Sequence, residues 1–198
     1  MTTRIGINGF GRIGRTYLRA ALAGGADVEV VAVNDLTDAG TLATLLEWDS
    51  VNGHFGGVAV EDDGLRVADR VIRVFSEPEP ARIPWGEVGA DVVIDATGFF
   101  TDREKAAEHL RGGARKVIVS APAKGDVPTF VLGVNDDRLD VSAADVFSNG
   151  SCTTNSLAPL AKVLNDVVGI ETGLMTTVHA YTGDQRLHDA PHLSLIHI

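Results

Sequence analysis

The sequence predicts an α/β fold built around a doubly wound parallel sheet. Short apolar runs rich in Val and Ile alternate with stretches whose apolar residues recur at helical spacing. A glycine-rich turn at residues 9–14 (GFGRIG) joins the first apolar run to the first helical stretch. The hydrophobic fraction of 44% and the charged fraction of 22% are typical of a globular α/β protein. Repeated strand–helix units of this kind form a parallel sheet with helices on both faces.

The chain is acidic, with a net charge of −10 at pH 7 over 198 residues. This balance argues against nucleic acid or an anionic membrane as a partner, although a small anion needs only local positive potential. The N-terminal residues lead directly into a strand pattern, and no apolar run approaches the roughly 18 residues of a membrane span. One cysteine cannot form an internal disulfide. We therefore expect a cytoplasmic protein.

The first third has the pattern of a dinucleotide-binding unit, with a strand, a helix and a second strand at residues 4–8, 15–22 and 28–33. Gly9 permits the tight turn, Gly11 lets the backbone approach a pyrophosphate, and Gly14 lets the helix pack on the strand. Asp35, 21 residues after Gly14, can accept a hydrogen bond from a ribose hydroxyl and repel a 2′-phosphate. The pattern predicts a Rossmann-type domain that binds NAD rather than NADP. The alternative is a glycine-rich turn without a ligand.

The middle of the chain completes the predicted sheet. We expect helices at residues 39–46 and 102–110, a loop at 48–57, short antiparallel strands at 58–60, 65–67 and 71–75, and further strands at 91–97, 116–120 and 129–134. Thr101 or Asp102 can cap the second helix. Thr97, Gly98 and Ser120 follow strand ends, where open α/β sheets bind ligands. They are either walls of the cofactor crevice or ordinary turn residues.

Residues 148–155 (SNGSCTTN) hold Cys152, the only cysteine. They lie between a strand pattern at 145–148 and a helical pattern at 157–164. Backbone N–H groups and the positive end of the helix dipole favour a thiolate at such a helix start. Cys152 is therefore either a nucleophile or a small buried cysteine.

His179 ends a predicted strand at residues 174–178. A strand end and a helix start can meet over one crevice, where an imidazole stabilises a thiolate and can act as general base. The alternative is a hydrogen-bonded core histidine. We expect no metal site. The remaining histidines lack such a partner and are expected at the surface or in loops: His54, His109, His188, His192 and His197.

Several motifs occur in a characteristic order, at residues 7–15 (INGFGRIGR), 96–98 (ATG), 120–122 (SAP), 148–155 and 178–182 (VHAYT). Together they resemble phosphorylating glyceraldehyde-3-phosphate dehydrogenase of type I, from Thr3 to about His192. The resemblance implies a glycolytic enzyme that uses NAD and inorganic phosphate to convert glyceraldehyde 3-phosphate to 1,3-bisphosphoglycerate. It implies a thioester on Cys152, with His179 as the base. The alternatives are erythrose-4-phosphate dehydrogenase and a non-catalytic NAD-binding protein.

The resemblance also implies binding roles and a homotetramer. Arg12, Ile13, Asp35 and Ser120 match positions that contact NAD in the family. Positions that bind the substrate phosphate or inorganic phosphate match Ser151, Thr153 and Thr182. Pro78 stands where the family often has an arginine whose backbone lies near the adenine, so this cofactor contact keeps a carbonyl but loses a side chain. Ser156 stands where many members have a second cysteine, so Cys152 lacks a local disulfide partner.

We expect an NAD-binding domain at residues 1–150, the start of an α+β catalytic domain at 151–192 and a non-native tail at 193–198. The tail (LSLIHI) departs from the basic segment that the resemblance implies, and the codons CTG-TCT-CTT-ATA-CAC-ATC for it match a transposon mosaic end. The chain would then be C-terminally truncated, without the phosphate-binding arginine and the late asparagine of the family. Uncovered apolar surface would leave it poorly soluble and nearly inactive alone.

Overall fold

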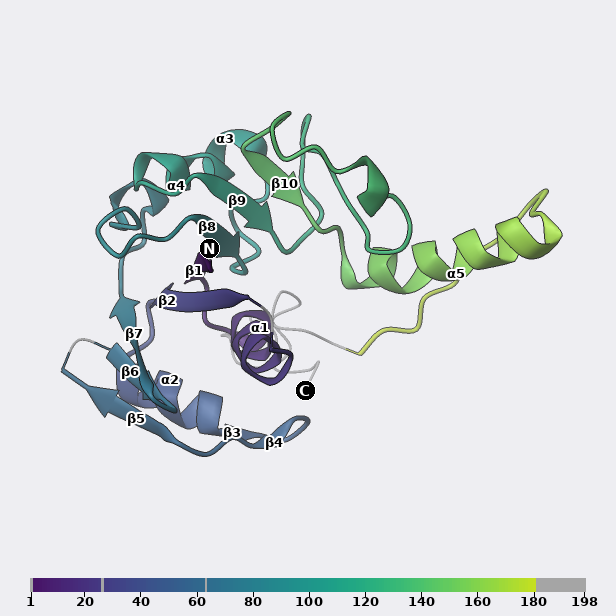
Figure 1. Ribbon diagram of the computed structural model, residues 1–198. Coiled ribbons are helices and arrows are strands. Elements are labelled where there is room, and N and C mark those ends of the chain that lie inside the picture. Colours follow the sequence, from purple (N-terminus) through teal and green to yellow (C-terminus); the bar gives the residue numbers. More distant parts are fainter. Residues whose placement is uncertain (1, 26, 63, 181–198) are drawn as a thin grey trace, which may run out of the picture.

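The computed structural model describes residues 2–25, 27–62 and 64–180, and it is built around one eight-stranded sheet of order β10-β9-β8-β1-β2-β7-β6-β5 (Figure 1). Neighbouring strands from β10 to β7 are parallel, whereas β5, β6 and β7 pair antiparallel. This arrangement confirms the predicted fold class. The strands are β1 (Thr3–Asn8), β2 (Val28–Asn34), β5 (Val58–Glu61), β6 (Gly64–Val67), β7 (Arg70–Phe75), β8 (Val92–Asp95), β9 (Lys116–Val119) and β10 (Val146–Ser148).

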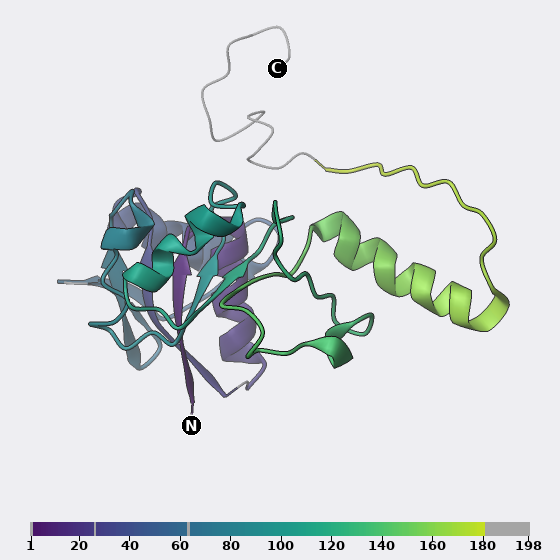
Figure 2. The same ribbon diagram turned by 90° about the horizontal axis from the view of Figure 1, so that it is seen from above.

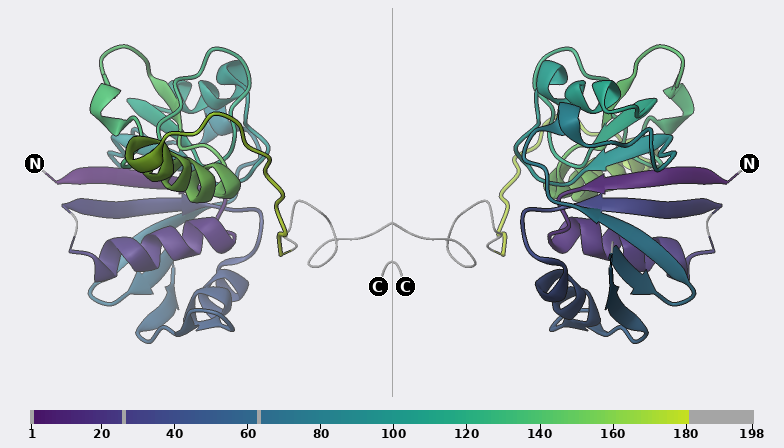
Figure 3. Two further views of the ribbon diagram at one scale, coloured as in Figure 1. Left: turned by 90° about the vertical axis from the view of Figure 1, so that its right-hand side faces the viewer. Right: turned by 90° about the vertical axis from the view of Figure 1, so that its left-hand side faces the viewer.

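The sheet has an apolar cluster on each face, since successive residues of a strand point to opposite faces. On one face Leu18 and Leu42, from two helices, pack against Ile7 of β1. On the other face Trp85 packs against Val93 of β8. Figure 3 shows β1 and β2 (purple) edge to edge, with α1 lying against them. The helices are α1 (Arg12–Ala23), α2 (Ala39–Glu47), α3 (Arg103–Ala106), α4 (Glu108–Arg111) and α5 (Cys152–Val168), with 3-10 turns η1 (Pro80–Arg82) and η2 (Asp136–Arg138).

Several predicted elements differ in the structure. The expected helix 102–110 is divided into α3 and α4, and Asp102 caps α3 by accepting from the Lys105 N–H at 3.0 Å. The expected loop 48–57 contains a small hairpin of β3 (Trp48–Asp49) and β4 (Gly53–His54). The predicted strand 129–134 is wrong, since only Thr129 forms a bridge, to Ser148. There the Asn135 side chain accepts from the Val131 N–H and donates to the Thr129 carbonyl, which bends the chain away from the sheet.

Helix α5 projects from the body of the molecule, and the segment 171–180 runs back beside it (Figure 2). None of the residues of α5 is buried. The predicted strand 174–178 is wrong: no described residue pairs with its backbone in a sheet, and both Leu174 and Val178 are fully exposed. No helix in the described ranges is long and apolar enough to cross a membrane.

Candidate functional site

The loop between β10 and α5 is fixed by its own polar side chains. Ser148 Oγ donates to the Ala121 carbonyl at 2.8 Å and accepts from the Gly150 N–H at 3.0 Å. Ser151 is the N-cap of α5, because its Oγ accepts from the Thr154 N–H at 2.9 Å. Asn155 Nδ2 donates to the Ser151 carbonyl at 2.9 Å. These bonds place Cys152 at the first position of the helix, exposed rather than buried.

Cys152 and His179 lie in contact at this helix start. The Sγ atom is 3.1 Å from the Nε2 atom. His179 Nδ1 is in hydrogen-bonding contact with the Ala180 carbonyl, so Nδ1 carries a proton and Nε2 faces the thiol. The hydrogen bond with His179 lowers the pKa of the Cys152 thiol from its ordinary value, helped by the Thr153 N–H and opposed by partial burial. The arrangement favours a thiolate on Cys152 with an imidazole placed to exchange its proton.

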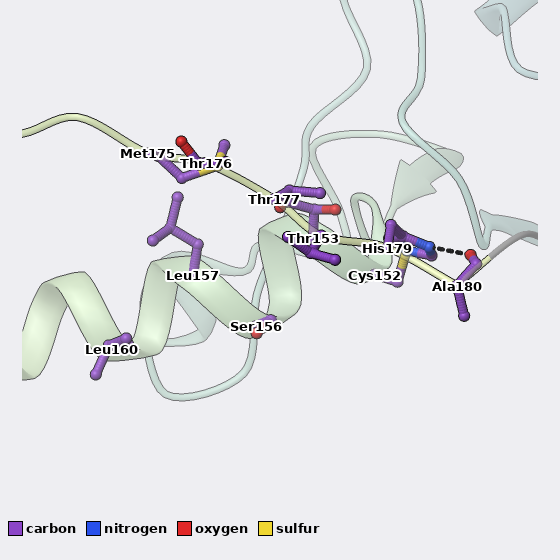
Figure 4. A pocket seen from close by; sticks show the side chains of 11 residues that line it. Cys152, Thr153, Ser156, Leu157, Leu160, Met175, Thr176, Thr177, His179 and Ala180 are labelled. Carbon is purple, nitrogen blue, oxygen red and sulfur yellow. Dashed lines mark hydrogen bonds between the residues drawn. The ribbon is translucent and has the colours of Figure 1, made fainter.

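An open cavity of about 420 Å³ lies beside this pair. Its walls come from the first turns of α5, including Thr153 and Leu157, and from residues 175–180. Figure 4 shows Leu157 pointing toward Met175, with Cys152 and His179 at one end. Of the three predicted phosphate ligands, Thr153 lines this cavity and Ser151 caps the helix. Thr182 lies outside the described residues.

The three glycines of the turn between β1 and α1 differ in what surrounds them. Gly9 has φ +86°, and a Cβ there would lie 2.8 Å from the Thr97 nitrogen. A Cβ on Gly14 would lie 2.3 Å from the Gly9 carbonyl oxygen. By contrast, a Cβ on Gly11 would meet no atom within 4 Å. The first and last glycines therefore close the turn, and the middle one faces open space.

Asp35 holds this turn from the end of β2. Its Oδ2 accepts from the Phe10 N–H at 2.8 Å, and its Oδ1 accepts from the Thr37 N–H at 2.9 Å. The two predicted cofactor residues of α1, Arg12 and Ile13, are exposed beside the turn. Arg12 donates to Asp49 at 2.9 Å. Asp35, which was expected to accept a hydrogen bond from a ribose hydroxyl, therefore also holds the glycine-rich turn in place.

The other predicted cofactor residues lie at the carboxyl edge of the same sheet. Thr97 and Gly98 follow β8, and Ser120 follows β9. The Ser120 N–H donates to the Asp95 carbonyl at 2.9 Å, which ties these two strand ends together. Pro78 is exposed after β7. Because β10 is the next strand after β9, the start of α5 extends the same edge.

His109 is not a surface or loop residue as predicted, but is fully buried in α4. Its Nε2 lies 3.0 Å from Asp95 Oδ2, and its Nδ1 lies 3.0 Å from the indole nitrogen of Trp85. Those partners come from other elements, so no local pattern around His109 could reveal them. His54 is exposed in β4, in agreement with the prediction, while His188, His192 and His197 lie outside the described residues. The part of the chain that the structure describes contains no cluster suited to a metal ion.

Comparison with known families gives two matches. Residues 3–103 match the family described as "Glyceraldehyde 3-phosphate dehydrogenase, NAD binding domain". Residues 151–196 match "Glyceraldehyde 3-phosphate dehydrogenase, C-terminal domain". The second match includes residues 193–196 of the predicted tail. The predicted domain boundaries, at residues 150 and 192, stay a prediction.

Curated relatives with the same description cover nearly the whole chain. "Glyceraldehyde-3-phosphate dehydrogenase 1" of Streptomyces avermitilis is 57% identical over 196 residues, which is 98% of this chain and 59% of the relative. The enzyme of Geobacillus stearothermophilus is 56% identical over 98% of this chain and 58% of its own length. "Glyceraldehyde-3-phosphate dehydrogenase 1" of Bacillus subtilis is 55% identical over 97% of this chain and 57% of its own length. The chain therefore spans less than two thirds of these relatives.

Proposed function

This chain belongs to the glyceraldehyde-3-phosphate dehydrogenase family, and from that premise we propose that it carries the NAD site and the thiol–imidazole pair of a glycolytic enzyme. The enzyme would convert glyceraldehyde 3-phosphate and inorganic phosphate to 1,3-bisphosphoglycerate. The observation that carries this proposal is the 3.1 Å contact between Cys152 Sγ and His179 Nε2 at the start of α5. The chain spans only 59% of the Streptomyces avermitilis relative. The activity is therefore proposed for a full-length protein, in which this chain is joined to a segment like the unmatched part of that relative.

The pair can carry out the covalent steps. The Cys152 thiolate attacks the aldehyde carbon, and the imidazolium of His179 gives its proton to the developing alkoxide, so that a hemithioacetal forms. The neutral imidazole then accepts the hydroxyl proton as the carbon loses a hydride and becomes a thioester. NAD, when bound, accepts the hydride. Phosphate then attacks the thioester carbon, and the thiolate leaves as the acyl phosphate forms. Backbone N–H groups at the start of α5 can stabilise the oxyanions that develop in both attacks.

The residues around the glycine-rich turn fit NAD. Gly11 is the N-cap of α1, yet no side chain caps the helix there and its first turn has no acidic residue. Uncapped N–H groups at a helix start bind phosphate oxygens, and the open space at Gly11 lets a pyrophosphate approach them. In this proposal Arg12, Ile13, Asp35 and Ser120 contact the cofactor.

In this proposal phosphate is held by hydroxyl groups at the start of α5. Hydroxyl groups of Ser151 and Thr153 can donate to phosphate oxygens, but Ser151 Oγ already serves the helix cap. Without a cation these groups would hold phosphate weakly. We therefore expect the 198-residue chain alone to be nearly inactive. Homotetrameric assembly and a cytoplasmic location stay predictions that family membership supports.

The test is a grafted enzyme. Residues 1–192 of this chain are fused to the segment of the Streptomyces avermitilis relative that has no counterpart in this chain. NADH formation by the fusion is then measured with glyceraldehyde 3-phosphate and phosphate. We expect phosphate-dependent turnover that is lost in Cys152→Ser. Higher turnover on erythrose 4-phosphate would favour the alternative dehydrogenase. NAD binding without turnover on either aldehyde would favour a non-catalytic NAD-binding protein.

A further inference from the structure

A buried polar network lies directly beneath the predicted cofactor turns. Five polar or charged side chains are buried among the described residues, and four of them form this network: Asn8, Asn34, Asp95 and His109. The first three are the last residues of β1, β2 and β8. Asn8 is paired in register with both Asn34 and Asp95, so their side chains lie side by side at the carboxyl edge.

Hydrogen bonds connect the network from strand to strand. Asn34 Nδ2 donates to Asn8 Oδ1 at 2.8 Å. Asn8 Nδ2 donates to Asp95 Oδ2 at 2.9 Å. The same carboxylate oxygen lies 3.0 Å from His109 Nε2, which reaches it from α4. Buried polar groups that are all satisfied in this way rigidify the elements that they join.

Trp85 sets the tautomer of His109. An indole N–H can only donate, and the Trp85 Nε1 atom lies 3.0 Å from His109 Nδ1. His109 Nδ1 must therefore accept, and the ring proton is on Nε2. That N–H is directed to Asp95 Oδ2, because its other neighbour, Asn8 Nδ2 at 3.4 Å, is itself a donor. The indole thus orients a donor toward a buried carboxylate.

The network holds the turns on which the predicted cofactor residues stand. Asp95 Oδ1 accepts from the Thr97 N–H at 3.1 Å and from Thr97 Oγ1 at 2.7 Å. The Asn34 side chain donates to the Glu77 carbonyl and accepts from the Glu77 N–H, next to Pro78. The Gly9 N–H donates to the Asn34 carbonyl at 2.8 Å.

We propose that His109 is a positioning residue for the NAD site, acting through Asp95. Its Nε2–H fixes one carboxylate oxygen, so that the other remains directed at the Thr97 turn. Without this donor only the Asn8 amide would hold that oxygen, so the carboxylate could rotate more easily and the Thr97–Gly98 wall of the crevice would loosen. The inference rests on the proposed NAD site, but it concerns a residue that touches neither cofactor nor substrate.

The experiment compares three variants of the 198-residue chain. His109→Leu removes the donor, His109→Gln keeps an N–H that can reach Asp95, and Leu42→Ala creates a core defect in α2 away from the network. NAD affinity is measured by calorimetric titration, and amide hydrogen exchange is measured without NAD over residues 96–100. We expect His109→Leu to raise the Kd for NAD about tenfold and His109→Gln to stay within about threefold of the unsubstituted chain. Exchange over residues 96–100 should accelerate in His109→Leu alone.

Unchanged exchange and affinity in folded His109→Leu would overturn the proposal, as would an equal loss of affinity in Leu42→Ala. If His109→Leu does not fold, Trp85→Phe removes the indole donor and must accelerate the same exchange for the proposal to stand. Failure of the unsubstituted chain to bind NAD would contradict the proposed cofactor site instead. The exchange measurement would still decide whether His109 orders the Thr97 turn.

Discussion

The Nε2 atom of His179 lies 3.1 Å from the Sγ atom of Cys152, although 27 residues separate them in the sequence. The chain brings them together by reversing after α5, so that residues 171–180 run back to the start of the helix (Figure 2). The cavity beside the pair is lined by these two segments. A base and a thiol can therefore meet here without a packed core around them.

Alanine at either of two glycines of the first turn should weaken NAD binding, but only one of the two changes should lower the melting temperature. In Gly14→Ala the new Cβ would lie 2.3 Å from the Gly9 carbonyl, so we expect a lower melting temperature and weaker NAD binding together. In Gly11→Ala the Cβ meets no protein atom, so we expect an unchanged melting temperature but weaker NAD binding. Thermal unfolding and calorimetric titration check both. A Gly11→Ala chain that binds NAD normally would show that the pyrophosphate does not approach this turn.

Asp49 should contribute a pH-dependent part of the stability. Backbone N–H groups of Asn52 and Val51, and then Arg12, lower the pKa of its carboxyl from 3.8 to about 2. Because the folded pKa is the lower one, this stabilisation is present above pH 3.8 and is lost as the pH falls toward 2. At neutral pH the Asp49→Asn chain should therefore have a lower melting temperature than the unsubstituted chain. The difference between the two melting temperatures should become smaller as the pH falls from 3.8 toward 2. The exposed Asp69→Asn is the control, and a gap independent of pH would contradict the assignment.

Removal of the α5 cap should weaken the helix that carries the nucleophile. Ser151→Ala deletes the oxygen that accepts from the Thr154 N–H, at a cost of about 1 kcal/mol. Because no residue of α5 is buried, tertiary packing cannot conceal this loss. We expect a weaker helical circular dichroism signal and faster exchange of the Thr154 amide. Ser156→Ala, one turn later in the helix, should leave the circular dichroism signal and the exchange of the Thr154 amide unchanged. If Ser156→Ala had the same effects as Ser151→Ala, Ser151 would have no specific capping role.

The apolar side of α5 should limit the solubility of the chain. Leu160, Val163 and Val167 have exposed fractions of 57%, 60% and 76%. Contiguous exposed apolar residues mark a surface that other protein normally covers. We expect the triple change of these residues to Gln to raise the saturation concentration, while Lys162→Gln should not. An unchanged saturation concentration would show that this face is not the cause of aggregation.

The sequence was informative where chemistry is local. The glycine-rich turn could be predicted because each glycine has its own steric reason, and the structure has those contacts at Gly9 and Gly14. The family resemblance is confirmed by the matches over residues 3–103 and 151–196. The helix start at Cys152 also follows from a local pattern, since Ser151 is a strong N-cap residue.

Predictions failed where distant partners decide the outcome. His109 has polar partners on β8 and near η1, and no pattern along α4 specifies them. The strand expected at 129–134 contains suitable residues, but the side chain of Asn135 competes for its backbone groups. The strand expected at 174–178 needs a neighbouring strand, and the described residues contain none beside it.

The most direct test of the Cys152–His179 pair is the pH dependence of iodoacetamide labelling. Cys152 is the only cysteine, so the label reports a single thiol. The hydrogen bond with His179 lowers the pKa of that thiol from 9.0, so the unsubstituted chain should label rapidly at neutral pH. In His179→Ala the midpoint should move upward toward 9.0, and labelling at neutral pH should slow about tenfold, while exposed His54→Ala should match the unsubstituted chain. Identical profiles with and without His179 would contradict an activated thiol.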